Sequence, residues 1–246
     1  MLFTVDIGNT TVAIAGLEGE RVAFVKKLPS DPGLNWPAAL RQLLEGVEAQ
    51  GAVLSSVVPA LTGPVGEGLK AITGKPVLVV DKTTPTGLDL SGYDTANLGM
   101  DRVVDCVAAL AMYTTPVAVF DMGTATTLSV VDRGGLFRGG MILPGLALGL
   151  EALSARAAQL PPITRSQPEG LLGTDTVSCM KYGALYGAAG AIEGIVARLE
   201  DQLGPLTVVL TGGNSAYVRP LLRCPTAWEP NLTFLGLREL WLRQYG

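Results

Sequence analysis

Two stretches of the chain share one pattern of apolar and polar positions. Residues 2–5 and 117–120 are mostly apolar, and each run ends at a carboxylate, Asp6 or Asp121, followed by one residue, a glycine and then hydroxyl side chains. This pattern predicts a buried strand that ends in a polar turn. A glycine there reaches backbone angles that other residues resist and lets a ligand approach the main chain, and threonine hydroxyls beside backbone N–H groups suit a phosphate. A strand ending in an ordinary hairpin with a solvated aspartate is the alternative.

The similarity of the two stretches extends beyond this motif. An offset of 115 residues pairs Asp6 with Asp121, Gly8 with Gly123, Thr11 with Thr126 and Gly19 with Gly134. An internal repeat of this kind predicts a duplicated domain, with halves at residues 1–115 and 116–246. Two facing copies would bring two carboxylates and two phosphate-binding turns into one cleft, which suits a polyphosphate bound with a metal ion.

The spacing of apolar residues predicts the secondary structure of each half. In the first half it predicts strands 2–6, 11–16 and 21–26, helix 35–47, strand 52–58, helix 61–72 and strand 76–80. In the second half it predicts strands 117–121, 126–132 and 136–142, helices 146–160 and 177–203, strand 206–210, helix 214–223, strand 226–229 and helix 233–244. A loop over 83–99 and a helix over 100–111 connect the halves, and a surface flap is expected over 161–168. The expected fold class is α/β.

Composition narrows the class of protein. Hydrophobic residues make up 48% of the 246 residues and charged residues 16%, which is typical of a well-buried globular protein. The net charge is −4 without a basic run, so we expect no nucleic-acid partner. The uncharged segment 106–120 falls short of the ~18 apolar residues of a membrane helix, so we expect no membrane association. Cys106, Cys179 and Cys224 are odd in number and far apart, which predicts reduced thiols in a cytoplasmic protein.

The chain contains no histidine. This excludes Ser–His and Cys–His nucleophiles, the commonest general base and the usual zinc ligand. Acid–base chemistry therefore falls to carboxylates, lysine, tyrosine or cysteine. The hairpins at residues 6–11 and 121–127 contain no lysine either, so positive charge for a phosphate must come from elsewhere.

Four further motifs, taken with the two hairpins, resemble a known family. They are Leu98-Gly99-Met100-Asp101-Arg102, Gly139-Gly140-Met141-Ile142-Leu143-Pro144-Gly145, Gly173-Thr174-Asp175-Thr176 and Thr211-Gly212-Gly213. In this order they closely resemble type III pantothenate kinase, in the superfamily of acetate and sugar kinases, heat-shock chaperone ATPases and actin. The resemblance implies two duplicated ribonuclease-H-like halves, each a mixed sheet flanked by helices, with the active site in the cleft between them. It also implies an enzyme that uses ATP to phosphorylate pantothenate to 4′-phosphopantothenate, the first step of coenzyme A biosynthesis.

The resemblance also implies roles for individual residues. Asp101 would accept the proton of the substrate hydroxyl, although a carboxylate that only complements a helix dipole is the alternative for this position. The implied ATP-binding residues are Asp6, Ile7, Gly8, Asn9, Thr10, Thr11, Val12, Ala13, Gly123, Thr124, Thr126, Gly212 and Gly213. The implied pantothenate-binding residues are Tyr93, Gly99, Met100, Asp101, Arg102 and Thr176. The segment from Gly139 to Gly145 resembles a turn that places backbone amides near the substrate.

Metal ions are implied at the two strand ends. Asp6 and Asp121 would hold Mg²⁺ directly or through its waters. The resemblance further implies dependence on a monovalent cation, K⁺ or NH₄⁺, which Asp121 would bind. Two positions depart from the family pattern: Ala96 stands where proline is usual, and Asp175 stands where asparagine is usual.

Two other function classes stay open. One is a kinase or ATPase of the same fold that acts on another small molecule, and the motif from Gly99 to Arg102 argues against it. The other is a non-catalytic regulatory relative, and the retention of Asp6, Asp101 and Asp121 argues against that.

Four glycines fall within the predicted helix 177–203. They are Gly183, Gly187, Gly190 and Gly194. Each costs ~1 kcal/mol relative to alanine in a helix, so their grouping predicts a tight helix–helix contact, across the two halves or across a homodimer. The resemblance implies a homodimer, in which Thr176 completes the substrate pocket from the partner subunit.

Overall fold

The computed structural model describes residues 1–156, 163 and 166–246, and contacts divide the chain into two compact units. Unit 1 contains Met1–Leu90, Asp94–Met112 and Asn231–Gly246, and unit 2 contains Ser91–Tyr93 and Tyr113–Pro230. The predicted division after residue 115 lies close to one observed boundary. The last helix departs from that division because it packs on the first strand and the third helix of unit 1.

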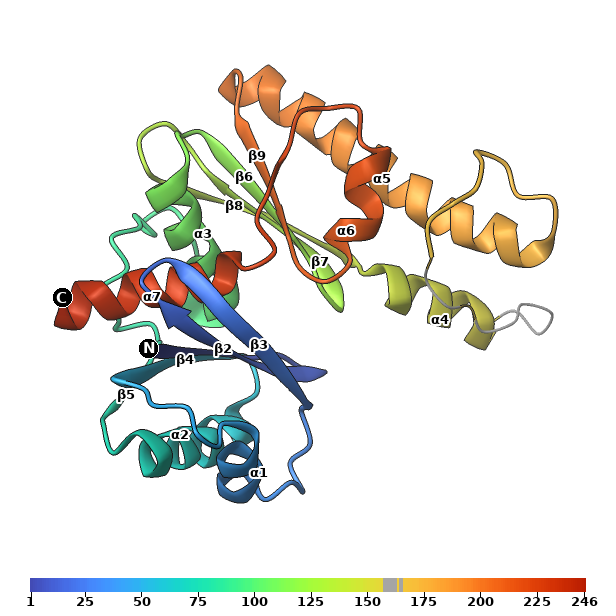
Figure 1. Cartoon of the computed structure of the whole chain (residues 1–246). Coiled ribbons are helices and arrows are strands. Elements are labelled where there is room, and N and C mark those ends of the chain that lie inside the picture. Colours follow the sequence, from blue (N-terminus) through green and yellow to red (C-terminus); the bar gives the residue numbers. More distant parts are fainter. Residues whose placement is uncertain (157–162, 164–165) are drawn as a thin grey trace. The chain divides into compact units, whose positions relative to one another are not determined.

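Unit 1 is built on a five-stranded sheet with the strand order β3-β2-β1-β4-β5 (Figure 1). Its elements are β1 (Leu2–Ile7), β2 (Thr11–Glu18), β3 (Arg21–Pro29), α1 (Trp36–Leu43), β4 (Gly51–Ser56), α2 (Pro59–Thr73), β5 (Val77–Val79), the 3-10 helix η1 (Thr95–Asn97), α3 (Met100–Met112) and α7 (Leu232–Tyr245). Strand β1 pairs antiparallel with β2 and parallel with β4, so the sheet is mixed.

Unit 2 is built on a second five-stranded sheet, with the order β10-β9-β6-β7-β8 (Figure 1). Its elements are β6 (Val117–Met122), β7 (Ala125–Val131), β8 (Phe137–Pro144), α4 (Leu146–Arg156), α5 (Thr176–Leu203), β9 (Thr207–Thr211), α6 (Ser215–Val218), the 3-10 helix η2 (Arg219–Leu221) and β10 (Ala227–Trp228). Strand β6 pairs antiparallel with β7 and parallel with β9. Both sheets therefore have the same order and the same strand directions around their first strand, which confirms the predicted duplication.

The two copies differ by one residue in the first hairpin. Ile7 pairs with Val12 across the hairpin of unit 1, and Met122 pairs with Thr126 across that of unit 2. The offset of 115 residues on the first strand is therefore 114 on the second, and Thr126 matches Val12. The predicted equivalence of Thr11 and Thr126 is wrong, because the hairpin of unit 2 is one residue shorter.

The alternation of side chains along β1 decides which layer Asp6 faces. Phe3, Val5 and Ile7 belong to a hydrophobic core formed with α1 and α2. Leu2 belongs to a different core, formed with α3 and α7. Successive side chains of a strand point to opposite faces, so Asp6 lies on the face of Leu2, where α3 and α7 cover the sheet.

The same alternation operates in unit 2. Ala118, Phe120 and Met122 belong to a core formed largely with α5. Asp121, between two of these residues, therefore lies on the other face of its sheet.

Several predicted helices end earlier than expected. Helix 35–47 is only α1, which ends at Leu43, and helix 214–223 is reduced to α6 and η2 where Pro220 lacks a backbone donor. Helix 146–160 is described as far as Arg156, and most of the predicted flap at 161–168 lies outside the described residues. Within the part of the chain that the structure describes, no helix is long and apolar enough to cross a membrane.

Candidate active site

Asp6 is the last but one residue of β1 and lies on the face of the sheet that α3 and α7 cover. Its Oδ1 accepts a hydrogen bond of 3.2 Å from Ser55 Oγ on the neighbouring β4. Burial, and then the charge of Asp101, raise the pKa of Asp6 to about 6, while the Ser55 hydrogen bond and the charge of Lys27 oppose the shift. A raised carboxyl pKa means that the ionised form lacks sufficient compensating charge nearby. A metal ion would supply it.

Asp101 lies in the first turn of α3. Burial raises the pKa of its carboxyl, while the backbone N–H of Arg102, which donates to Asp101 Oδ1 at 2.9 Å, and the charge of Arg102 oppose the shift. Because the charge of Asp101 acts on Asp6, the structure brings the predicted base close to the predicted phosphate-binding hairpin. A carboxylate that only complements the helix dipole would not require this proximity.

The residues around Asp101 are fitted closely to it. A Cβ atom at Gly99 would collide with Asp101 Oδ1, so a side chain at this position would displace the carboxylate from where it lies. Met100 begins α3 and is half-buried, and Arg102 is 8% exposed. The segment 99–102 therefore holds a carboxylate and a guanidinium at the start of one helix, as the substrate-binding prediction needs.

The hairpin of unit 1 presents its main chain at the end of β1. The N–H of Gly8 donates to the carbonyl oxygen of Thr11 at 3.0 Å, and Asn9 and Thr10 are exposed at the tip. Neither Gly8 nor Gly123 adopts a positive φ. The expectation that backbone angles require glycine at these two positions is therefore wrong. Close approach of a ligand to the bare main chain stays a prediction.

Ser30 fastens this hairpin and was missed by the sequence analysis. Its Oγ donates to the carbonyl oxygen of Gly8 at 2.6 Å, and its N–H donates to the carbonyl oxygen of Thr10 at 3.1 Å. Ser30 follows β3, which reaches the hairpin only through the sheet order. No local pattern in the sequence marks it.

Lys27 is a second residue that the sequence analysis missed. It lies on β3 and pairs in register with Ala13, which in turn pairs with Asp6. Its charge lowers the pKa of Asp6, against the larger effect of burial. The hairpins contain no lysine, but the third strand supplies one on the same face of the sheet.

In unit 2, Asp121 is the last but one residue of β6, as Asp6 is of β1. It pairs in register with Thr211, the last residue of β9. The next residue, Gly212, adopts a φ of +82°, and a Cβ atom there would collide with Asp121 Oδ1 and with the main chain of Met122. The predicted cation-binding carboxylate and the predicted adenosine turn are therefore adjacent. Glycine suits position 212 because it tolerates the positive φ and has no Cβ atom to collide with Asp121.

Two neighbours hold the hairpin of unit 2. Asn214, which is 4% exposed, donates its N–H to the carbonyl oxygen of Met122 at 2.9 Å and its Nδ2 to that of Gly123 at 2.8 Å. Gly145 donates its N–H to the carbonyl oxygen of Thr124 at 3.1 Å. The prediction of a turn over residues 139–145 is wrong, because residues 139–144 belong to β8 and the amide of Gly145 donates to Thr124 of the hairpin.

Tyr93 lies in unit 2, although the helix that follows it in sequence belongs to unit 1. Its ring packs edge-on against Phe137, with the ring centroids 5.1 Å apart. It also lies over Gly139, which has a φ of +101° and where a Cβ atom would be 3.3 Å from the ring. The predicted pantothenate-binding residues are thus divided between the units, with Asp101 and Arg102 in unit 1.

Thr176 is the exposed first residue of α5. Asp175 caps the helix: its side chain accepts the N–H of Ser178 at 3.0 Å, and the hydroxyl of Ser178 donates to its other oxygen at 2.8 Å. These hydrogen bonds lower the pKa of Asp175. Aspartate at this position therefore serves as an N-cap residue, as asparagine would.

The donor set fits a loosely held divalent ion. No group of three or more His, Cys, Asp and Glu side chains gathers among residues 1–156, 163 and 166–246. Mg²⁺ commonly binds through one or two carboxylates together with substrate phosphates and water. Asp6 fits this use because it is partly buried and its pKa is raised.

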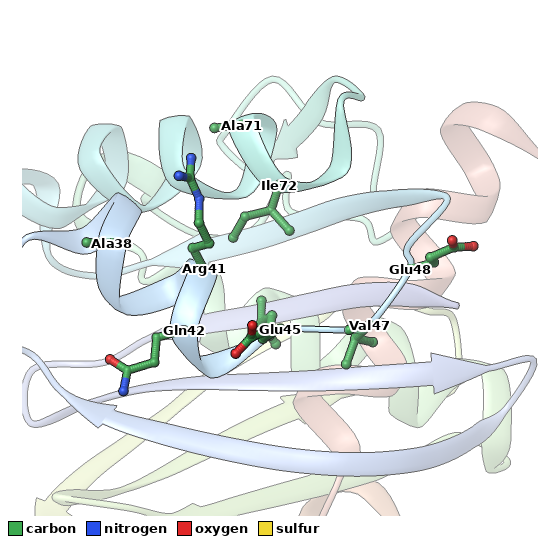
Figure 2. Close-up of a pocket in the computed structure, with 10 residues that line it drawn as sticks. Ala38, Arg41, Gln42, Glu45, Val47, Glu48, Ala71 and Ile72 are labelled. Atoms are coloured by element: carbon green, nitrogen blue, oxygen red, sulfur yellow. The ribbon is translucent and has the colours of Figure 1, made fainter.

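A pocket of about 800 Å³ lies elsewhere in unit 1, around the C-terminal ends of α1 and α2 (Figure 2). Its lining includes Arg41, Glu45, Val47 and Ile72. Because α1 and α2 pack on the face of the sheet opposite Asp6, this pocket is not part of the candidate site.

A duplicated mixed sheet with a carboxylate at the end of each first strand defines the class of phosphotransferases and ATPases that includes sugar kinases. Within this class, the chain belongs to the type III pantothenate kinase family, whose model matches residues 2–198. The type III pantothenate kinase of Moorella thermoacetica is 35% identical to it over 252 residues and 99% of both chains. That of Rhodospirillum centenum is 38% identical over 252 residues and 97% of both chains. These matches confirm the resemblance found in the sequence.

Solved structures support the fold. The ethanolamine utilization protein EutJ of Carboxydothermus hydrogenoformans superposes with a TM-score of 0.55 at 17% identity, covering 97% of this chain and 89% of that one. The inorganic polyphosphate/ATP-glucomannokinase of Arthrobacter sp. superposes with a TM-score of 0.50 at 14% identity, covering 98% of both. At these identities the likeness concerns the fold alone. It agrees with the duplicated ribonuclease-H-like halves expected from the sequence.

Proposed function

We propose that this chain transfers the γ-phosphoryl group of ATP to the primary hydroxyl of pantothenate, giving 4′-phosphopantothenate and ADP. This is the reaction of the family to which the chain belongs, and it is the first step of coenzyme A biosynthesis. In this chain, one observation carries the proposal: Asp101 lies near enough to Asp6 for its charge to raise the pKa of that carboxyl. The proposed proton acceptor thus lies near the proposed phosphate-binding hairpin.

Asp101 is the proposed general base. A base works best when its pKa approaches the working pH, and burial raises that of Asp101. The N–H and the charge of Arg102 limit the rise and so keep the carboxylate available in its ionised form. Arg102 itself would bind the pantothenate carboxylate, since a guanidinium offers two parallel donors. Tyr93, Gly99, Met100 and Thr176 complete the proposed substrate-binding set.

The hairpins are proposed to hold the nucleotide. The main chain of residues 6–13 in unit 1, and Gly123, Thr124 and Thr126 in unit 2, would bind the phosphates through N–H and hydroxyl groups. Gly212 and Gly213 would lie against the adenosine. Asp6 would hold Mg²⁺, directly or through water, and the ion would neutralise the phosphate oxygens when bound.

A monovalent cation, K⁺ or NH₄⁺, is proposed at Asp121. The carboxylate lies where β6 meets the hairpin, and the main-chain oxygens of that turn would complete an oxygen cage. Turnover at fixed ionic strength in KCl, NH₄Cl, NaCl and choline chloride tests this. Activation by K⁺ and NH₄⁺ alone, lost in Asp121→Ala, is the expected result, and equal rates in all four salts would remove the cation from the proposal.

We infer a homodimer from α5. In Gly183, Gly187 and Gly190, a Cβ atom would meet no heavy atom within 4 Å among the described residues, apart from the helix's own backbone. A stripe of glycines open to this extent suits close approach of a second helix. We also infer a cytoplasmic location, since all three cysteines are free and a reducing compartment keeps thiols in that state.

The test measures phosphopantothenate formation by wild type and by Asp101→Asn. The variant should lose ~10²–10⁴-fold in kcat, the usual contribution of a general base, while its affinity for a non-hydrolysable ATP analogue stays near that of wild type. The matched control is Asp105→Asn, one turn further along α3, where the carboxylate accepts a hydrogen bond from Thr233 at 2.7 Å. It should retain turnover.

Three outcomes would contradict the proposal. Wild-type turnover in Asp101→Asn with saturating pantothenate would remove the assigned base. ADP release with a different hydroxyl compound, but none with pantothenate, would favour a same-fold kinase of other specificity. A wild type that phosphorylates no acceptor would favour a non-catalytic relative.

A further inference from the structure

Three strands of the unit 1 sheet, β4, β1 and β3, place polar groups in one row on the face where Asp6 lies. Ser55 on β4 pairs with Asp6 on β1, Asp6 pairs with Ala13 on β2, and Ala13 pairs with Lys27 on β3. Residues paired across strands point to the same face. Lys27 therefore lies on the same face as Asp6, and Ala13 is the residue between them in the register.

One strand, β2, separates Lys27 from Asp6 on this face of the sheet. Ala13 on β2 stands between them in the register and packs in one hydrophobic cluster with Phe234 of α7.

The end of β3 is fixed to the phosphate-binding hairpin. Thr11 pairs in register with Pro29, and Ser30 donates hydrogen bonds to the carbonyl oxygens of Gly8 and Thr10. Lys27 lies on β3, three residues before Ser30, which follows the strand. Its backbone is thus held in place relative to the hairpin by strand pairing and by these two hydrogen bonds.

The neighbouring Lys26 makes contacts on the other face of the sheet. Lys26 points to the opposite face, where its Nζ donates to the carbonyl oxygen of Leu43 at 2.5 Å and lies 5.3 Å from the centroid of the Phe24 ring. Lys27 is exposed. The two neighbouring lysines therefore have different roles, and only Lys27 faces the carboxylates.

We propose that Lys27 contacts the terminal phosphate of bound ATP. This rests on the proposed function of the site. Two carboxylates, Asp6 and Asp101, share this part of unit 1, and an added polyphosphate would bring further negative charge. The hairpin of residues 6–11 contains no lysine, so Lys27 supplies cationic charge to the γ-phosphoryl group from the third strand.

The experiment compares nucleotide affinity by calorimetry in the presence of Mg²⁺. Two ligands, ADP and the imido analogue of ATP, are each titrated into wild type, Lys27→Met, Lys27→Arg and Lys26→Met. A charge-assisted contact of this kind is worth ~10- to 100-fold in affinity. Lys27→Met should lose about that factor for the ATP analogue and distinctly less for ADP. Lys27→Arg should recover most of the loss, and Lys26→Met should bind both like wild type.

Two results would overturn the inference. Unchanged affinity of Lys27→Met for the ATP analogue would show that Lys27 makes no phosphate contact. Equal losses for Lys27→Met and Lys26→Met, or no recovery with arginine, would show a structural effect on β3. The phosphopantothenate assay on wild type separates this failure from failure of the proposed function: a wild type that turns over pantothenate while Lys27→Met binds normally refutes only the role of Lys27.

Discussion

Asp6 makes the stability of unit 1 depend on pH. Its pKa is raised to about 6 from an ordinary value of 3.8. Between these two values the folded chain keeps a proton that the unfolded chain has released, so stability falls as the pH rises. Asp6→Asn removes this titration. Without Mg²⁺ or nucleotide, the variant should gain ~1–3 kcal/mol of unfolding free energy over wild type at pH 7, and about half as much at pH 5.

Urea unfolding of both proteins in EDTA between pH 5 and pH 8 measures this difference. Asp201→Asn, which changes an exposed aspartate on α5, controls for the loss of one charge. A difference between Asp6→Asn and wild type that stays constant over this range would show that Asp6 is not the titrating group.

Thr4 carries a buried hydroxyl without a partner. Its side chain is 0% exposed, and Thr4 Oγ1 has no hydrogen bond within the described part of the chain. Burying such a group costs free energy, so Thr4→Val, which keeps the shape and removes the hydroxyl, should raise the unfolding free energy by ~1 kcal/mol. Urea denaturation measures it. Thr4→Ser keeps the hydroxyl and should not stabilise, and a destabilised Thr4→Val would reveal a hydrogen bond to buried water.

At the scale of elements, the sequence predicts strands and hairpins well because each has a local signal. Apolar runs mark β1, β4, β6 and β9, and an Asp-x-Gly motif marks each first hairpin. The sequence does not show that the second hairpin is one residue shorter. The repeated motifs align the first strands of the two halves but do not determine the register of the second strands. Nor does it show Lys27 and Ser30, which join the site only through the order of strands in the sheet.

The turn after β9 offers a matched pair of glycines. Gly212 has a positive φ and contacts Asp121, whereas at Gly213 a Cβ atom would meet nothing within 4 Å. Gly212→Ala should therefore lower the unfolding free energy by ~1–3 kcal/mol through strain and collision. Gly213→Ala should leave stability unchanged and weaken ATP binding, because the added methyl group occupies space proposed for adenosine.

Thermal unfolding and ATP-analogue titration of the two variants separate these effects. Equal stability losses would mean that the turn as a whole, rather than the conformation of Gly212, resists substitution. Unchanged nucleotide affinity in Gly213→Ala would place the adenosine elsewhere.

For the whole molecule, the open glycines of α5 predict the state of association. Gly187→Leu adds a large side chain to the proposed interface and should convert a dimer to a monomer in sedimentation velocity at micromolar concentration. The matched control is Gly63→Leu on α2, where a Cβ atom also meets nothing within 4 Å. It should sediment like wild type. A monomeric wild type would contradict the interface and a role for Thr176 across it.

Helix α7 affects the order in which the two units can fold during synthesis on the ribosome. Leu237 and Leu240 fill the unit 1 core together with Leu2 and Val104, yet they are translated after all of unit 2. Translation at about 5–20 residues per second takes roughly 6 to 24 s to pass from the end of α3 to the start of α7. During this time one face of the unit 1 sheet lacks α7. Unit 2 takes only Ser91–Tyr93 from earlier in the chain. The part that emerges first is therefore the last to be completed.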